Sequence, residues 1–179
     1  RAVAGDAENH RLPAHRRRQL ADQVAAAGLP KSGVMIEVPA AALGARHVLA
    51  PVDFGSLGTN DLAQYTMAAD RMQGALSDLL DPWQPAVLRL IQHTCIAGHE
   101  YNVPVGVCGE AAADPLLACV LTGLGVNSLS AASTAVAGVG AQLAELTFDQ
   151  CQQLADAALN SEGPSAARAA AMEQIEKFN

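Results

Sequence analysis

Four short apolar segments, each followed by a helical pattern, recur along this chain of 179 residues and constrain its fold more than any other feature. The apolar segments cover residues 34–38, 52–57, 103–108 and 126–130. The helical patterns cover residues 40–49, 86–99, 114–121, 147–159 and 164–177, and a Thr-Asn-Asp helix start lies at 59–61. Strands that alternate with helices in this way pair in parallel and are joined by right-handed crossovers. The sequence therefore predicts an α/β fold.

Four strand–helix units equal half of a (β/α)8 barrel, since a complete barrel typically has about 250 residues. The periodicity leaves two arrangements open, namely half of a split barrel and an open parallel sheet. Residues 1–30 are expected to form a linker followed by a helix at 14–27, which Gly28 ends. Residues 31–179 are expected to form the domain that carries the repeated units.

The net charge of −7 is unevenly distributed along the chain. Five arginines and two acidic residues lie within the first 18 residues, whereas the remainder has six basic and 16 acidic residues. An acidic body argues against nucleic acid as a partner, because phosphate contacts need clustered lysine and arginine. The run Arg16-Arg17-Arg18 is either a contact patch or a solvated helix face. No apolar run approaches the roughly 20 residues of a membrane span, so we expect no membrane partner.

Four cysteines occur in the chain, and none forms a C-x-x-C pair or a zinc-binding spacing with histidine. Because the sequence shows no secretory signal pattern, we expect reduced thiols in a cytoplasmic protein. Cys95, Cys119 and Cys151 fall within helical patterns. These three are therefore predicted to be packing residues without a disulfide.

Polar residues follow the apolar segments at the carboxyl ends of the predicted strands, where the chemistry of α/β folds is concentrated. Glu37 lies at the end of the first segment, and Asn60 and Asp61 follow the second. A carboxylate at the end of a buried strand is costly unless it is paired or binds a cation. Glu37 could instead form a structural ion pair, and Asp61 could cap a helix. Together the two carboxylates indicate a Mg²⁺ site, because Mg²⁺ takes one or two protein carboxylates together with water and substrate oxygens.

Two further residues have both a functional and a structural interpretation. Cys108 ends the third apolar segment and is followed by glycine, a position suited to chemistry, although a free cysteine is more often a small buried hydrophobe. Arg71 lies in a loop beside Asp70. Alone it would be a surface residue, but in a phosphate site it would form a bidentate clamp.

Several long motifs, in order, resemble those of the phosphoenolpyruvate (PEP)-utilising enzymes. The first is GVMIEVPAA at 33–41, the metal-ligand strand of that family, and the second is SLGTNDLAQYT at 56–66, continuing to Arg71. The motifs PAVLRLI at 85–91 and VGVCGE at 105–110 complete the match. The spacings also fit, with 24 residues from Glu37 to Asp61, 10 from Asp61 to Arg71 and 47 from Asp61 to Cys108. The resemblance covers roughly residues 32–143 and is closest to the enzyme I branch, which serves the sugar phosphotransferase system.

The resemblance implies a (β/α)8 barrel of the PEP/pyruvate type, of which this chain would supply the C-terminal half, strands five to eight. It also implies a homodimer. Glu37 and Asp61 would hold Mg²⁺, and Asn60, Asp61 and Arg71 would contact the substrate. Cys108 would be the catalytic acid that protonates the enolate to pyruvate. Phosphoryl transfer to a histidine, and from there to a histidine-containing phosphocarrier protein, would need an N-terminal domain whose motif this sequence lacks.

Two alternatives remain open beside an enzyme I fragment. One is a fragment of PEP synthase or pyruvate phosphate dikinase, and the other is a non-catalytic dimerisation or regulatory module. The first half of the barrel is expected to supply further arginines, so we expect the isolated chain to be inactive and to bind PEP weakly. One local departure is Gln84, which stands before Pro85 where family members often have histidine.

Overall fold

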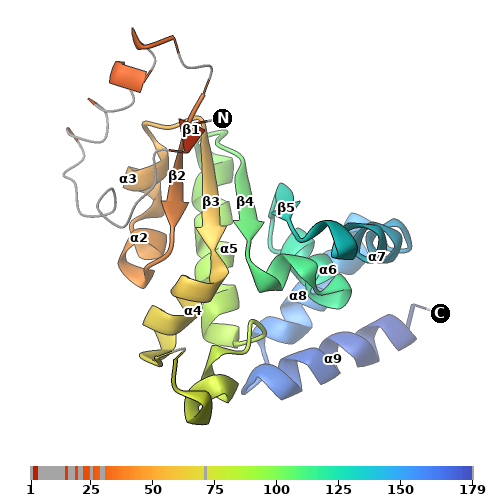
Figure 1. The fold of residues 1–179 in the computed structure, drawn as a ribbon. Coiled ribbons are helices and arrows are strands. Elements are labelled where there is room, and N and C mark those ends of the chain that lie inside the picture. The colour runs from red at the N-terminus through yellow and green to blue at the C-terminus, as the bar shows by residue number, and fades with distance from the viewer. Residues whose placement is uncertain are drawn as a thin grey trace.

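The structure, a computed structural model, describes residues 2–3, 15, 19, 22–24, 26–28, 31–70 and 72–178. Its centre is a parallel five-stranded sheet with the order β1-β2-β3-β4-β5. The strands are β1 (Ala2–Val3), β2 (Ser32–Ile36), β3 (Phe54–Gly58), β4 (Val105–Cys108) and β5 (Ser128–Ser130). Each strand therefore pairs with the next strand in sequence, and the predicted α/β fold with a parallel sheet is confirmed (Figure 1).

The connections between the strands contain most of the helices. They are α2 (Pro39–Leu43), α3 (Ala45–Leu49), α4 (Thr59–Met67), the 3₁₀ helix η2 (Gly74–Leu80), α5 (Pro85–Glu100), the 3₁₀ helix η3 (Glu110–Ala113) and α6 (Pro115–Gly123). Three helices follow β5, namely α7 (Ser133–Ala144), α8 (Phe148–Leu159) and α9 (Pro164–Glu176). Among the described residues, no helix combines the length and the apolar character that crossing a membrane requires.

The two faces of the sheet differ in character. Ile36, Leu57 and Val107 lie in register on one face and are each at most 1% exposed. The same face packs against α3 and α5, and Figure 1 shows α5 behind β3 and β4. The opposite face mixes small or polar residues with Met35 and Phe54, and Ser56 and Cys108 there are only half-buried. The helix-covered face therefore holds the apolar core, and the opposite face carries the thiol of Cys108.

The sequential order of the strands bears on the architecture. A doubly wound sheet reverses its strand order at a switch point, which is where such folds bind ligands. The described strands show no reversal. With right-handed crossovers, a sequential parallel order places every connecting helix on one face, as one side of a (β/α)8 barrel does. The assignment of these strands to positions five to eight of a barrel remains a prediction.

The structure corrects four details of the predicted elements. The helix expected at 40–49 is interrupted at Gly44, whose N–H donates to Ala40 O at 3.1 Å. Helix α7 was not predicted, because its run of alanine, valine and glycine lacks a polar face. Strand β1 pairs with β2 although a linker was expected there, and η2 lies in a segment expected to be a loop.

Predicted features in the first 30 residues are only partly described. The described positions within the expected helix at 14–27 are helical up to Ala26, and Gly28 has a φ of 72° that suits a helix end. The run Arg16-Arg17-Arg18 lies outside the described residues. The domain boundary at residue 30 remains a prediction.

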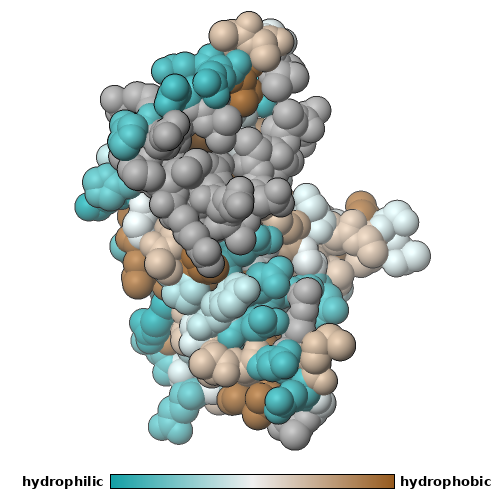
Figure 2. Space-filling view, turned by 60° about the vertical axis from the view of Figure 1, so that its left-hand side comes forward, coloured by the Kyte–Doolittle hydropathy of each residue, from teal (hydrophilic) through white to brown (hydrophobic). Residues whose placement is uncertain are grey.

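On the face seen in Figure 2, the coloured residues do not separate into a hydrophilic and a hydrophobic half. Figure 2 shows hydrophilic and hydrophobic residues interspersed over the visible coloured part of one face. Exposed large apolar side chains stand on separate elements, for example Tyr65 on α4, Ile96 on α5 and Met172 on α9. Single exposed apolar residues of this kind are normal on a soluble surface.

Helices α6 and α8 approach so closely at Gly123 that a side chain there would collide with the backbone. A Cβ at Gly123 would lie 2.0 Å from Cys151 O. We expect Gly123→Ala to lower the free energy of unfolding by about 2 kcal/mol, because backbone cannot yield as a side chain does. Gly140→Ala in α7 is the matched control, since nothing lies within 4 Å of its Cβ position. There alanine should stabilise by up to about 1 kcal/mol. Urea unfolding of both variants measures the difference, and equal effects would contradict the close approach.

Candidate functional site

The predicted site residues stand at the carboxyl ends of three neighbouring strands. Glu37 directly follows β2, Asn60 and Asp61 lie in the first turn of α4 directly after β3, and Cys108 is the last residue of β4. Because β2, β3 and β4 are parallel and adjacent, these residues share one edge of the sheet. In Figure 1 this edge faces downward, where the arrowheads of β2, β3 and β4 point. Glu37 and Asp61 are thus at the same end of the sheet, and their convergence on a metal ion remains a prediction.

Glu37 lies over the end of β3. A Cβ at Gly58 would be 2.7 Å from both Cγ and Oε1 of Glu37, so the carboxylate occupies space that only a glycine leaves open. Asp61 follows Gly58 by three positions in the sequence. Both carboxylates make interactions within the structure. Because Gly58 has no side chain, the Glu37 carboxylate can lie over the end of β3. This strand continues directly into α4, the helix that carries Asp61.

The end of β4 is attached to the start of α4 by two hydrogen bonds. Thr59 Oγ1 donates to Cys108 O at 2.9 Å, and the backbone N–H of Glu110 donates to Asn60 Oδ1 at 3.4 Å. Gly109 lies between them with a φ of 105°, a conformation that side chains disfavour. A Cβ there would also lie 2.8 Å from Thr59 Oγ1. These contacts hold Asn60 and Cys108 next to each other.

The Cys108 thiol has defined hydrogen-bond partners. Its Sγ donates to Leu57 O at 3.4 Å and accepts from Ser56 Oγ at 3.7 Å. Both partners belong to β3, so the thiol leans across the neighbouring strand. A half-buried thiol held at a strand end can transfer its proton to a group placed above the sheet.

The other three cysteines are buried and free, which confirms the predicted packing role without a disulfide. Burial raises the pKa of Cys95 to about 12. Burial, together with the neighbouring Cys151, raises the pKa of Cys119 to about 12. Burial also raises the pKa of Cys151, against a smaller opposite effect of Cys119. These thiols remain protonated near neutral pH.

A carboxylate that the sequence suggested only as a helix start, Asp114, accepts four hydrogen bonds. Asp114 Oδ1 accepts from the backbone N–H of Leu116 and Leu117 and so caps α6. Its Oδ2 accepts from Trp83 Nε1 at 3.1 Å and from Arg168 Nη2 at 2.7 Å. Burial alone would raise the pKa of Asp114, but these hydrogen bonds and the charge of Arg168 outweigh it and lower the pKa. The Asp114-Pro115 pair signals the cap, whereas nothing local signals the other partners.

Two further predictions concern the contact made by Arg71 and the metal site. Arg71 lies outside the described residues. Within the described part of the chain, no three His, Cys, Asp or Glu side chains gather into a metal-binding group. This does not conflict with a site for Mg²⁺, which needs only one or two protein carboxylates.

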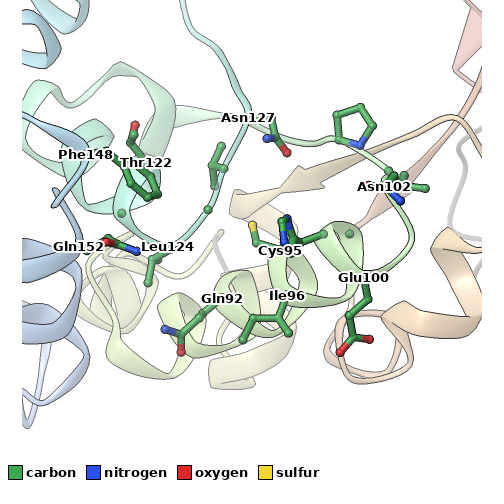
Figure 3. A pocket seen from close by; sticks show the side chains of 17 residues that line it. Gln92, Cys95, Ile96, Glu100, Asn102, Thr122, Leu124, Asn127, Phe148 and Gln152 are labelled. Atoms are coloured by element: carbon green, nitrogen blue, oxygen red, sulfur yellow. The ribbon is translucent and has the colours of Figure 1, made fainter.

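A hollow of about 640 Å³ lies at the opposite end of the sheet. Its wall includes Val103 and Pro104, which precede β4, and Gly125 to Asn127, which precede β5. Figure 3 shows Cys95 and Ile96 of α5 on one side and Phe148 and Gln152 of α8 on another. None of the predicted site residues lines it. The candidate site is therefore defined by the residues at the carboxyl ends of the strands and not by this hollow.

Comparison with known proteins supports the motif assignment. A family model described as "PEP-utilising enzyme, PEP-binding domain" matches residues 7–148. The chain belongs to this family. The match includes Glu37, Asn60, Asp61, Arg71 and Cys108, and it ends where α8 begins.

Individual relatives in the PEP-utilising family are larger proteins. The phosphoenolpyruvate-protein phosphotransferase of Streptomyces coelicolor is 56% identical over 152 residues, which cover 84% of this chain and 27% of that protein. That of Geobacillus stearothermophilus is 43% identical over 128 residues, covering 72% and 22%. The multiphosphoryl transfer protein of Rhodobacter capsulatus is 47% identical over 127 residues, covering 71% and 15%. The matched part of the chain thus spans about a quarter or less of the length of these relatives.

The four thiols should differ sharply in reactivity. We expect iodoacetamide at pH 8 to modify Cys108 about 100-fold or more faster than Cys95, Cys119 or Cys151, because Cys108 is half-buried whereas the others are buried and almost fully protonated. Peptide mass spectrometry over a time course measures each rate, with a urea-unfolded sample as the control in which the rates converge. Comparable rates in the folded protein would contradict the described burial.

Proposed function

We propose that this chain carries the metal-binding and proton-donating part of a PEP-dependent protein phosphotransferase, enzyme I of the sugar phosphotransferase system. The observation that carries the proposal is the meeting of Glu37, Asn60 with Asp61, and Cys108 at three consecutive strand ends. Family membership and the phosphotransferase activity for which the relatives are named support it. The proposed architecture is the C-terminal half of a (β/α)8 barrel, strands five to eight.

The residues at the sheet edge fit a Mg²⁺ ion. Glu37 and Asp61 supply two oxygen ligands, and the space left by Gly58 allows the Glu37 carboxylate to lie across the end of β3. Mg²⁺ prefers oxygen ligands and commonly completes its coordination with water and substrate oxygens. When bound, the ion would supply Lewis-acid stabilisation for the enolate that departs from the phosphoryl group.

The chain's own contribution to phosphoryl transfer is positioning and charge complementarity, which dominate this chemistry. In the proposal, Asn60 donates a side-chain N–H to the phosphoryl group, since its Oδ1 already accepts from Glu110. Arg71 supplies a positive, bidentate contact. The phosphoryl group passes to a histidine on another part of the complete protein and then to a histidine-containing phosphocarrier protein.

Cys108 completes the reaction by protonating the methylene carbon of the enolate, which yields pyruvate. Its Sγ–H, held between Ser56 and Leu57 O, is the available proton. The resulting thiolate would regain a proton from water. Thr59 and Gly109 fix the strand end from which the thiol is presented. The substrate pair is thus PEP and pyruvate, and the complete protein is proposed to be a cytoplasmic homodimer that drives sugar transport.

The space above Gly58 offers a test of the metal site. We expect Gly58→Ala to weaken Mg²⁺-dependent PEP binding about tenfold, or ~1.4 kcal/mol, because the new methyl group displaces the Glu37 carboxylate. Isothermal titration of the complete phosphotransferase with and without Mg²⁺ measures the effect. Gly163→Ala is the control, since its Cβ position is open. If affinity and Mg²⁺ dependence were unchanged, Glu37 would not be a metal ligand.

The proton donor can be tested separately from binding. In the complete phosphotransferase, Cys108→Ala should lower the rate of pyruvate formation at least 100-fold while the Kd for PEP changes less than about threefold, because proton donation acts in the transition state. Stopped-flow pyruvate detection and titration provide the two values. Cys95→Ala is the matched control and should keep normal turnover once the protein is folded. Normal turnover of Cys108→Ala would make this thiol a packing residue.

A further inference from the structure

The Asp114 carboxylate joins three parts of the chain that are distant in sequence. It accepts hydrogen bonds from Trp83, 31 positions away, and from Arg168, 54 positions away, besides the two backbone groups of α6. The Arg168 guanidinium carbon also lies 4.9 Å from the centre of the Trp83 ring. We call Trp83, Asp114 and Arg168 the clamp.

The clamp is more than a surface ion pair. Trp83 is fully buried, and its indole N–H is satisfied by Asp114, whose side chain is 20% exposed, whereas the Arg168 side chain is 47% exposed. In contrast, the Arg46–Glu100 pair has side chains 60% and 41% exposed. Charges shielded from water interact more strongly than exposed ones. The cation over the aromatic ring adds a further attraction. The three clamp groups therefore constrain one another.

Of the two clamp members within the family-matched region, Asp114 lies close in sequence to Cys108. Only five residues separate Cys108 from Asp114, including Gly109 and η3. Trp83 lies near the end of the connection between α4 and α5, in which Arg71 stands in the sequence. One carboxylate thus joins the segment that follows Cys108 to the end of the connection between α4 and α5.

The third member of the clamp comes from outside the family match. Arg168 belongs to α9, whereas the family model ends at residue 148. In Figure 1, α9 runs through the lower part of the view, toward which the strands β2, β3 and β4 point. Helix α9 packs on α8 and α6, and this packing holds Arg168 in place beside Asp114.

We propose that Arg168 is a positioning residue, which acts from α9 through Asp114 and Trp83 to hold the segment that presents the Cys108 thiol. The importance of this for catalysis rests on the proposed function, but the positioning itself concerns only this chain. Without Arg168, Asp114 loses its charged partner, and the turn from Gly109 through η3 loses the outer anchor that limits its movement.

The chain contains its own reporters for a test that needs neither PEP nor Mg²⁺. Trp83 is the single tryptophan, so its fluorescence reports the clamp directly. Alkylation of Cys108 reports the candidate site, and alkylation of the buried Cys95, Cys119 and Cys151 reports loss of the fold. The variants are Arg168→Ala, which suits the alanine-rich α9, and Arg168→Lys, which keeps a positive charge. The matched control is Arg46→Ala, which removes an exposed ion pair.

We expect Arg168→Ala to change the Trp83 emission and to raise the alkylation rate of Cys108 at least threefold, while the three buried thiols keep their slow rates. Arg168→Lys should give an intermediate rate at Cys108, and Arg46→Ala should leave all four rates and the emission unchanged. A changed emission with a Cys108 rate within twofold of the unmodified protein would overturn the proposal, because the clamp would then be uncoupled from the thiol. Faster alkylation of all four thiols in both Arg168 variants would also overturn it, since α9 would then serve the fold as a whole. Failure of PEP binding would affect only the proposed function.

Discussion

The candidate site depends on the close approach of three parallel strand ends at positions that carry no side chain. Gly58 is in register with Cys108 across β3 and β4, and the Glu37 carboxylate lies 2.7 Å from where a Cβ of Gly58 would be. At the next strand end, Gly109 allows Thr59 and Asn60 to approach. Larger residues at these two glycines would separate the groups that the proposal requires to act on one substrate. The pairing of the strands therefore determines where the site residues lie, and the loops that follow the strands contribute further residues.

The parts of the fold that follow local rules could be predicted from the sequence. Strand ends were correctly placed near Glu37, Asn60 and Cys108, because short apolar runs bounded by polar residues mark buried parallel strands. The helix start at Pro85 and the cap at Asp114 follow from residue type. Helix α7, the break at Gly44 and strand β1 have no comparable local signal. The contacts of Asp114 with Trp83 and Arg168 join residues 31 and 54 positions apart, so only the tertiary packing reveals them.

The two ends of the sheet have different physical characters. The amino end holds the hollow of about 640 Å³, whose wall combines exposed apolar side chains such as Ile96 with amides and with His99 and Glu100. The carboxyl end holds the carboxylates Glu37 and Asp61 and the half-buried thiol of Cys108. A compact anionic substrate in an acidic chain requires a cation to offset the repulsion between like charges. The proposed Mg²⁺ would therefore serve the electrostatics of binding as well as the reaction.

Asp114 links the stability of the fold to the geometry of the proposed site. Its pKa in the folded chain is lowered because hydrogen bonds from Trp83 and Leu117 and the charge of Arg168 outweigh the effect of burial. A carboxyl group whose folded pKa lies below its unfolded value stabilises the folded state fully above the unfolded pKa, and this contribution is lost as the pH falls through the folded pKa. Protonation would weaken the cap of α6, the contact with Trp83 and the attachment of α9 together, since all three use the same two oxygens. Near neutral pH the group remains ionised, so the same charge that stabilises the packing of α6 and α9 keeps the turn after Cys108 in place.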